Sequence, residues 1–278
     1  MQHNDQNMQM QLEQEHIRDR MGQIKHKVLV LSGKGGVGKS TVAVNMAIAL
    51  SLEGKKVGLL DIDIHGPSIP KVLNLEGRGL QADEHQNIMP VTVSDTLKVM
   101  SIGFMLAHQD DAVIWRGPRK YGVIKQFLKD VNWGEMDFLV IDSPPGTGDE
   151  PLAIVQLLEN ADGAVIVTTP QDVALSDVRK GITFCRNLNL PVLGVLENMS
   201  GFVCPKCGER TDIFKSGGGQ TMAEQMNVPF WGQIPIDPQI VRACDSGMPY
   251  VQYFSTSQAA KALKAAIAPL LELEKPTE

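Results

Sequence analysis

The chain has 278 residues, of which 43% are hydrophobic and 21% are charged, and its formal net charge is −6. This length suits one large α/β domain, because no linker divides it, and leaves ample residues for a core. The negative charge argues against a broad surface for nucleic acid, although a local basic patch stays open. No apolar run reaches the roughly 18 residues that are needed to span a bilayer.

The cysteines and the N-terminus indicate the compartment. The chain has four cysteines, and its polar N-terminus lacks the apolar stretch of a secretory signal. Cysteines in such a chain do not suggest a disulfide scaffold; they point to a reducing compartment and to thiol or metal chemistry. We therefore expect a cytoplasmic protein that binds neither membrane nor nucleic acid.

Residues 1–22 are rich in Gln, Met and charge, which predicts a mobile N-terminal arm with a short helix within residues 12–24. Thioether sulfurs can bind Cu(I), but we interpret the methionines of the arm as incidental. Residues 23–275 are predicted to form a single domain, with an inserted cysteine-containing segment at 200–215.

Short apolar runs alternate with helical stretches along this domain. Strands are predicted at residues 28–31, 57–60, 97–102, 138–141, 164–168, 192–196 and 229–234. Helices are predicted at 39–52, 117–130, 150–159, 173–188, 218–226, 237–245 and 256–273, and residues 76–95 as a small hairpin or a mobile loop. Strands separated by such helices indicate βαβ units, so we predict a mostly parallel β-sheet flanked by helices, a three-layer α/β/α fold. Ligands of such a sheet bind at the carboxyl ends of its strands.

Residues 33–41 read G-K-G-G-V-G-K-S-T and lie between the first strand and the first helix of the domain. They fit the phosphate-loop pattern G-x-x-x-x-G-K-[ST] in its expected context. Glycines let backbone N–H groups surround phosphate oxygens, and the helix N-terminus adds its positive dipole end. We expect Lys39 to reach the β- and γ-phosphates of ATP, and Ser40 to hold Mg²⁺. The expected nucleotide-binding residues of the loop are Gly33, Lys34, Gly35, Gly36, Val37, Gly38, Lys39, Ser40 and Thr41.

Acidic residues end two of the predicted strands. Asp61 and Asp63 point the same way in an extended chain, and together suit Mg²⁺ or the orientation of a water molecule. Asp142 reads as a further acid that holds Mg²⁺, through water. The loops at 63–70 and 143–149 are candidate switches. The alternative for Asp61 and Asp63 is that they are ordinary loop carboxylates. The alternative for the loop at 143–149 is a purely structural role.

Two further strand ends are candidates for contact with the base. Asn198 follows one strand and Asp237 lies shortly after another. An Asn amide can both donate to and accept from adenine, whereas the spacing alone fits a turn or a helix cap equally well. Both residues are candidate cofactor-binding residues.

Cys204 and Cys207 form a C-x-x-C turn in which Gly208 permits a tight backbone. Such a turn places two thiolates on one metal, whereas tetrahedral zinc or iron–sulfur sites need four ligands. Cys185 and Cys244 are isolated and are expected in or near the core. One chain therefore cannot readily complete the site, but two chains can.

Three interpretations of the turn compete. A redox C-x-x-C is disfavoured because it does not open a helix after a first strand. A structural zinc knuckle is a serious alternative, since C-P-x-C-G is typical of zinc ribbons. We favour a labile cluster that bridges two chains, because a shallow, easily opened site suits delivery.

Lys34 is a second lysine in the phosphate loop. The simplest interpretation is that its side chain is exposed to solvent and has no specific role. The loop resembles the deviant Walker A motif of the MinD/ParA-like ATPases, in which that lysine acts across a nucleotide-sandwich dimer. The resemblance implies a homodimer with Lys34 and Lys39 in catalytic roles. It also implies that Asp63 positions the attacking water, and that Asp61 either lies near Mg²⁺ or has a structural role. Asn198 is expected to contact the adenine.

Four motifs point to a narrower family within these ATPases. They occur in order at residues 24–41, 61–70, 141–150 and 197–208. Together they resemble the Mrp/ApbC iron–sulfur cluster carriers, a family of P-loop ATPases. The resemblance implies ATP hydrolysis coupled to a [4Fe–4S] cluster, which the dimer binds through Cys204 and Cys207 and passes to apo-proteins. No cysteine precedes Cys185, so we do not expect the N-terminal cluster site of the longer eukaryotic members.

The alternative function is a zinc-bridged dimeric ATPase of the ParA/MinD kind, acting as a positioning or scaffold protein. That class would need a membrane-targeting C-terminal helix or a basic DNA-binding face. Residues 259–267 are rich in Ala and only mildly amphipathic, which favours a packing helix.

Overall fold

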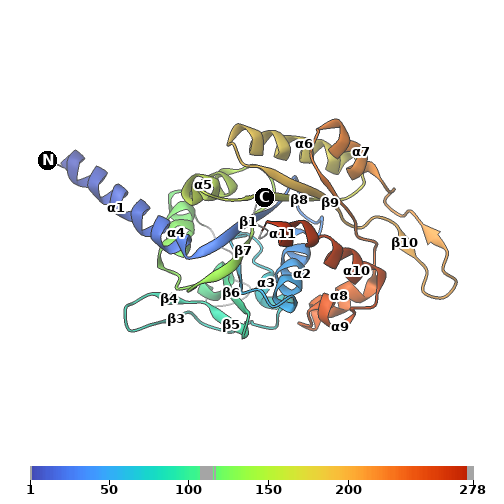
Figure 1. Cartoon of the computed structure of the whole chain (residues 1–278), viewed down its shortest axis with the longest axis horizontal. Coiled ribbons are helices and arrows are strands. Elements are labelled where there is room, and N and C mark those ends of the chain that lie inside the picture. Colours follow the sequence, from blue (N-terminus) through green and yellow to red (C-terminus); the bar gives the residue numbers. More distant parts are fainter. Residues whose placement is uncertain (1, 107–114, 116, 274–278) are drawn as a thin grey trace.

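The computed structural model describes residues 2–106, 115 and 117–273 (Figure 1). Residues 274–275, the predicted end of the domain, lie outside this description. Within the described residues, eight strands form one sheet in the order β12-β9-β8-β1-β7-β2-β6-β5. Neighbouring strands are parallel except at one edge, where β5 pairs antiparallel with β6. The mostly parallel sheet that the sequence predicts is therefore confirmed.

The elements follow the predicted alternation. The strands of the sheet are β1 (Ile24–Ser32), β2 (Val57–Asp61), β5 (Val91–Ser94), β6 (Leu97–Ser101), β7 (Met136–Asp142), β8 (Gly163–Thr168), β9 (Val192–Glu197) and β12 (Phe230–Gln233). The longer helices are α1 (Gln2–Gly22), α2 (Lys39–Leu52), α4 (Gly117–Asp130), α5 (Asp149–Leu158), α6 (Asp172–Asn187), α7 (Gly218–Gln225), α8 (Pro238–Asp245) and α10 (Gln258–Ala265). The short elements are α3 (Ile69–Val72), η1 (Ile102–Met105), α9 (Tyr250–Tyr253), α11 (Ala268–Glu272) and the strands β3 (Gln81–Ala82), β4 (Ile88–Met89), β10 (Phe202–Val203) and β11 (Arg210–Thr211).

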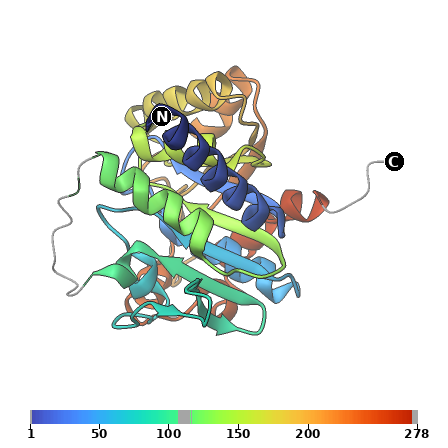
Figure 2. The ribbon, with the colours of Figure 1, turned by 90° about the vertical axis from the view of Figure 1, so that its left-hand side faces the viewer.

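Helices cover both faces of the sheet. Helix α2 packs on one face with α9 and α10 beside it, and α4, α5, α6 and α7 lie on the other (Figures 1 and 2). Every residue of β8 is buried, and so are residues 28–32 of β1. Strands enclosed on both faces read as continuous apolar runs, and for this reason the sequence predicts them well.

The C-terminal helix differs from its prediction. Instead of one helix over 256–273, the chain forms α10 and then α11. Ser257 caps α10 by accepting a hydrogen bond from the backbone N–H of Ala260 at 3.0 Å. Pro269 lies at the start of α11, where its missing N–H costs nothing; inside a longer helix it would remove a hydrogen bond.

Two small hairpins lie outside the main layers. Residues 76–95 contain the β3–β4 hairpin and the edge strand β5, so the predicted hairpin is present, and β5 is an addition. Three of the four residues of β5 are exposed, which weakens its sequence signal. The cysteine-containing segment forms the β10–β11 hairpin, which extends from the body of the molecule in Figure 1.

The N-terminal arm is a longer helix than expected, and its second half is docked. Ile17 and Met21 are buried against the domain, and Figure 2 shows α1 alongside α4. Glu13 pairs with Lys125 of α4. Docking explains the difference from the expected mobile arm, because packing against α4 stabilises a helix that the sequence of the arm favours only weakly.

We expect Ile17→Ala to lower the free energy of unfolding by about 3 kcal/mol, because a fully buried Ile leaves a cavity. Leu12→Ala, on the exposed part of the same helix, is the matched control and should change it by less than about 0.5 kcal/mol. Urea denaturation followed by circular dichroism measures both. Equal effects of the two substitutions would show that α1 is not docked in solution.

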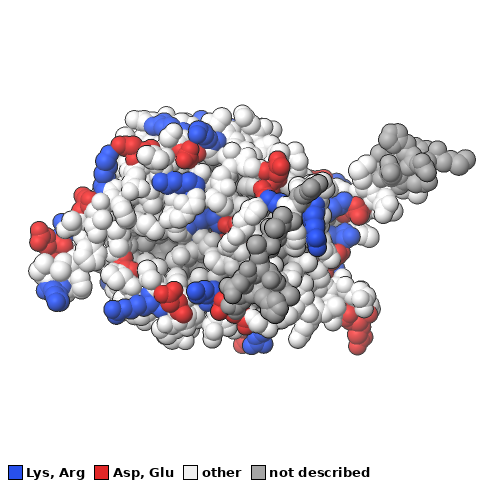
Figure 3. Space-filling model, turned by 180° about the vertical axis from the view of Figure 1, so that it is seen from behind, with Lys and Arg blue, Asp and Glu red and all other residues white. Residues whose placement is uncertain are grey.

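Charges are mixed on the surface that Figure 3 shows, where Lys and Arg lie interspersed with Asp and Glu. Within the described residues, no helix has both the length and the apolar character that crossing a bilayer requires.

Candidate functional site

The carboxyl ends of three adjacent parallel strands bring the predicted site residues together. The phosphate loop follows β1, and β1 pairs with β7, which pairs with β2. Asp61 ends β2, Asp142 ends β7, and the register places the two residues opposite each other. The structure thus places the loop and both acids at one edge of the sheet.

The phosphate loop has the backbone that its glycines predict. Gly36 and Gly38 have φ of 79° and 84°, in the left-handed region that favours glycine. A Cβ on Gly33 would lie 2.5 Å from the carbonyl carbon of Asp177 in α6, so the loop also depends on a close approach there. No side chain caps the N-terminus of α2, which leaves its first backbone N–H groups directed at the loop.

A cavity of about 230 Å³ lies over this loop. Lys34, Ser40 and Thr41 line it from the loop, and Asp63 and Pro145 line it from the two candidate switch loops. Backbone N–H groups, a helix N-terminus and lysines around one cavity form a site for phosphate groups.

Lys39 is buried at the centre of this arrangement. Its Nζ lies 2.6 Å from Oδ1 of Asp142 and 3.7 Å from Oδ2 of Asp63. It also donates to Oγ of Ser40 at 3.3 Å. The lysine therefore contacts three of the side chains that the sequence assigns to phosphate and Mg²⁺.

Burial raises the pKa values of the three acids around Lys39. Burial, and then the charge of Asp142, raise the pKa of Asp61 to about 8. Burial also raises the pKa of Asp142 and of Asp63, against the opposing charge of Lys39. Asp61 accepts hydrogen bonds from Oγ of Ser101 at 2.8 Å and from the N–H of Asp63 at 3.1 Å. Carboxyl groups that outnumber their cations favour the binding of a divalent ion.

The donor atoms fit magnesium. Oδ2 of Asp142 and Oγ of Ser143 are buried and have no hydrogen-bond partner among the described residues. Buried polar atoms without a partner are costly, and carboxylate and hydroxyl oxygens are the ligands that Mg²⁺ prefers. No group of three or more His, Cys, Asp or Glu residues in the described part of the chain could hold a metal ion. A magnesium ion here would thus take further ligands from phosphate and water.

Asn198 contacts the phosphate loop. Its side-chain amide donates to the carbonyl of Val37 at 2.8 Å, and its own N–H donates to Thr168 at 2.7 Å. A Cβ on Gly38 would lie 2.3 Å from Nδ2 of Asn198. One amide hydrogen of Asn198 is thus used to hold the loop, a contact across 161 residues that local sequence cannot reveal.

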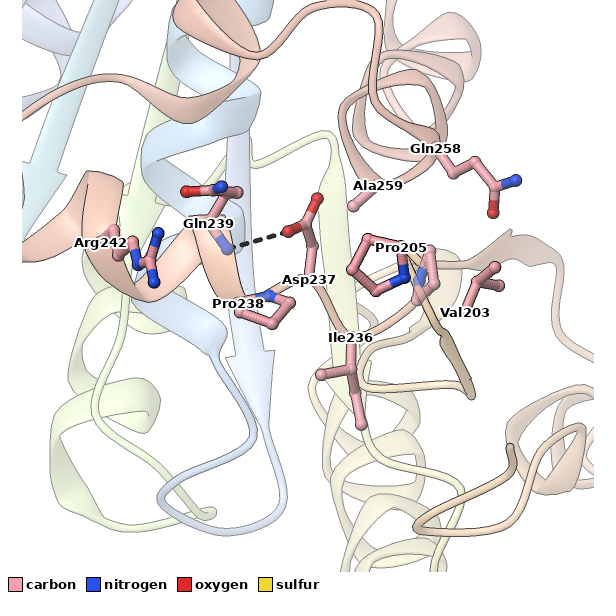
Figure 4. A pocket seen from close by; sticks show the side chains of 10 residues that line it. Val203, Pro205, Ile236, Asp237, Pro238, Gln239, Arg242, Gln258 and Ala259 are labelled. Atoms are coloured by element: carbon pink, nitrogen blue, oxygen red, sulfur yellow. Dashed lines mark hydrogen bonds between the residues drawn. The ribbon is translucent and has the colours of Figure 1, made fainter. Parts of the chain in front are cut away.

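Asp237 lies in a second, larger cavity of about 440 Å³ (Figure 4). It caps α8, accepting from the N–H of Gln239 at 2.8 Å and from the hydroxyl of Tyr250. Val203 and Pro205 of the cysteine hairpin form the facing wall. The structure therefore places Asp237 beside the cysteine turn and Asn198 beside the phosphate loop.

Two parallel segments connect these places. The N–H of Ser200 donates to Ile234 at 2.9 Å, and the N–H of Ile236 donates to Gly201 at 2.8 Å. The chain after β9 thus runs beside the chain after β12, from Asn198 to the first strand of the hairpin. These contacts place the segment that follows Asn198 and leads into the cysteine hairpin beside the segment that precedes Asp237.

Cys204 and Cys207 lie in the turn of the β10–β11 hairpin, the first half-buried and the second exposed. The N–H of Gly208 donates to the carbonyl of Cys204 at 2.8 Å, and Gly208 has φ of 74°. Backbone N–H groups of Cys207 and Lys206 hold the pKa of Cys204 below its ordinary value. The turn therefore favours the thiolate that metals bind.

The other two cysteines have different surroundings. Burial raises the pKa of Cys185 to about 11 and also raises the pKa of Cys244. They belong to α6 and α8, and neither is part of the hairpin. The turn thus presents the two thiols that the sequence proposes as ligands from one chain.

Sequence reasoning missed several polar contacts around this site. Ser101 holds Asp61, and Lys120 of α4 contacts both His65 and Glu150. Glu197 accepts from the N–H of Gly217 at 2.9 Å and fixes the start of α7. The partners in these contacts are far apart in the sequence. Among them, only Glu150 has a local signal, because acidic residues are typical of the first turn of a helix such as α5.

Known proteins resemble this chain in sequence and in fold. A ParA family profile, described as the NUBPL iron-transfer P-loop NTPase, matches residues 23–271. An iron–sulfur cluster carrier protein of Methanocaldococcus jannaschii is 54% identical over 235 residues, which cover 84% of this chain and 81% of that protein. A nucleotide-binding protein of Archaeoglobus fulgidus, solved in complex with ADP and with cobalt found in it, has a TM-score of 0.75 and 41% identity, over 85% of this chain and 92% of its own.

A second solved structure defines the wider fold. The cell division ATPase MinD of Pyrococcus furiosus has a TM-score of 0.66 and 26% identity, over 89% of this chain and 99% of its own. The family profile spans nearly all of the domain, including the phosphate loop and the cysteine turn. The chain therefore belongs to the ParA-type family of NUBPL iron-transfer P-loop NTPases.

Proposed function

We propose that the protein is a homodimeric ATPase that carries a [4Fe–4S] cluster to apo-proteins. The observation that carries the proposal is the pairing of a phosphate cavity with an exposed turn that offers two thiol ligands per chain. A cluster needs about four thiolates, so Cys204 and Cys207 of two chains would complete one site. The cluster is the cargo of the protein, and ATP is its substrate.

ATP would bind with its phosphates in the cavity over the loop. Backbone N–H groups at the start of α2 and the ammonium of Lys39 would face the phosphate oxygens, and Lys39 would exchange part of its contact with Asp142 for them. Mg²⁺, held by Ser40 and Asp142 with Asp61 nearby, would supply positive charge that neutralises the phosphates. Thr41 lines the same cavity.

Hydrolysis needs an oriented water molecule. Asp63 is partly exposed to the cavity and would orient the water for attack on the γ-phosphorus. The bond from that phosphorus to the bridging oxygen breaks, and ADP and inorganic phosphate form. Lys34 of each chain would reach the nucleotide of the partner and stabilise the developing charge.

Nucleotide and cluster binding would be coupled through the hairpin. The backbone contacts that run from Asn198 to the hairpin support this route, as does the shared cavity between Asp237 and Pro205. In the proposal Asn198 and Asp237 contact the base or the segments that hold it. Such a coupling must be reciprocal, so bound cluster would alter nucleotide affinity by the same factor.

The alternative, a zinc-bridged positioning or scaffold ATPase, has less support. Its fold would be the same, and the cysteine turn also suits zinc. Ala259, Ala260 and Leu263 of α10 are buried in the core, so this helix does not have an apolar face available for a membrane. Metal analysis separates the two functions.

We expect Asn198→Ala to weaken ADP binding about tenfold, because the carbonyl of Val37 loses a buried partner. Isothermal titration calorimetry with ADP and with inorganic pyrophosphate measures the effect. An equal loss for both ligands assigns Asn198 to the loop, and a loss for ADP alone assigns it to the base. Gln220→Ala on the surface of α7 is the control. Unchanged ADP affinity in Asn198→Ala would remove Asn198 from the nucleotide site.

A further inference from the structure

Three side chains outside the phosphate cavity form one connected group. The Nζ of Lys120 lies 2.7 Å from Oε1 of Glu150 and 2.7 Å from Nε2 of His65. Nε2 of His65 lies 3.9 Å from the same oxygen of Glu150. We call this group the Lys120 clamp.

The three residues come from three segments around the site. His65 follows Asp63 by two residues, on the loop after β2. Glu150 is in the first turn of α5, directly after the loop 143–149 that follows Asp142. Lys120 is in the first turn of α4. The clamp therefore joins the two loops that flank the phosphate cavity through a third element.

The chemistry of the contacts defines their direction. An ammonium has donors and no acceptor, so Lys120 donates to both partners and the Nε2 of His65 accepts with its lone pair. Although burial acts to raise it, the hydrogen bond from Lys120 holds the pKa of Glu150 below its ordinary value. Lys120 and Glu150 are 17% and 12% exposed, and a shielded, charge-assisted contact is stronger than an ordinary surface pair.

A second ion pair on α4 provides a comparison for the Lys120 clamp. Lys125 lies on the same helix, is 20% exposed and pairs with Glu13. That pair connects α4 to α1 and reaches neither loop of the site. The difference between the two lysines is therefore the identity of the segments that they join.

We propose that Lys120 is a positioning residue for ATP hydrolysis, because it holds the loop of Asp63 and the loop 143–149 in one mutual arrangement. This inference rests on the proposed ATPase function. Lys120 is not among the residues that line the phosphate cavity, so it acts through the loops and not on the nucleotide. The two loops then move as one unit when the nucleotide changes, since a single ammonium ties both.

The test compares Lys120→Met with Lys125→Met in the full-length protein. Lys120→Met keeps the length of the side chain and removes the donor, and we expect kcat to fall about tenfold with KM within about twofold of the wild-type value. Amide hydrogen exchange should accelerate in residues 64–68 and 146–150. Lys120→Arg should retain most of the activity, because a guanidinium can donate to both partners. Lys125→Met should change neither kcat nor exchange in these segments.

A double-mutant cycle adds a further readout. If Lys120 acts through Glu150, the loss of kcat in Lys120→Met with Glu150→Ala should not exceed that of the larger single loss. Additive losses, an unchanged kcat in Lys120→Met, or unchanged exchange in both loops would each overturn the inference. A wild-type protein without ATPase activity would instead overturn the proposed function, and the exchange comparison would still decide whether the clamp holds the loops.

Discussion

Lys39→Ala is expected to abolish ATP hydrolysis, with a loss of at least about a hundredfold in the rate of phosphate release. The substitution removes the ammonium that the proposed mechanism places on the β- and γ-phosphates. It also removes the partner that lies 2.6 Å from the buried carboxylate of Asp142. Phosphate release in the presence of Mg²⁺ and ATP measures the first effect, and ADP affinity measures how far binding is lost.

The same substitution threatens stability, so a second variant is needed. Breaking a buried ion pair by removing one partner costs about 3 kcal/mol, because the other charge is left without a counterion. Asp142→Asn in the Lys39→Ala background removes that charge and should recover much of the free energy of unfolding. Hydrolysis should stay absent in the double variant. Recovery of activity together with stability would mean that Lys39 acts through the fold and not on phosphate.

The Lys39→Ala variant also tests whether ATP hydrolysis drives cluster transfer. If Lys39→Ala still passes a cluster to an apo-protein at the wild-type rate, ATP does not drive that step. If transfer falls together with hydrolysis, the two are coupled as the backbone route from Asn198 to the hairpin suggests. The wild-type protein with and without ATP provides the matched comparison.

The fold follows from local patterns in the sequence. Each predicted strand lies where the structure has one. The central strands β1, β7 and β8 are the clearest, because parallel strands covered on both faces read as apolar runs, whereas the prediction at 97–102 includes Lys98 and that at 229–234 includes Gln233. The phosphate loop is predictable for the same local reason, since its glycines and Lys39 are consecutive in the chain and lie between a strand and a helix. The predicted single helix over 256–273 is wrong for a local reason as well, because Pro269 favours the start of a new helix over the interior of a long one.

The contacts within the site could not be predicted in the same way. Whether Asn198 meets a base or a loop depends on Val37, which is close only after β1 and β9 have joined one sheet. Helix α1 has no clear apolar face, and its docking depends on the surface that α4 and α5 present. The Lys120 clamp joins three segments with no shared motif. Sequence patterns identify elements, whereas pairings of polar side chains depend on the assembled fold.

Reconstitution with iron and sulfide without oxygen is expected to give about four iron and four sulfide per dimer. The reason is the number of ligands: each chain offers Cys204 and Cys207 on an exposed hairpin, and two chains supply the thiolates of one cubane cluster. Metal and sulfide analysis alongside an absorption spectrum measures the content, and the molecular mass in solution measures the dimer. Replacing both cysteines of the turn with Ala should remove the iron, the sulfide and the absorption.

Cys244→Ala is the matched control for that loss. Cys244 is half-buried in α8, and burial raises its pKa, so it is a poor ligand and its replacement should leave the iron content unchanged. One zinc per dimer that resists replacement by iron would instead identify the turn as a structural metal site. The ATPase would then move a different cargo, and the carrier function proposed for the hairpin would be wrong. Cluster loss in the Cys204 and Cys207 variant, with retention in Cys244→Ala, distinguishes the bridging site from adventitious thiol binding.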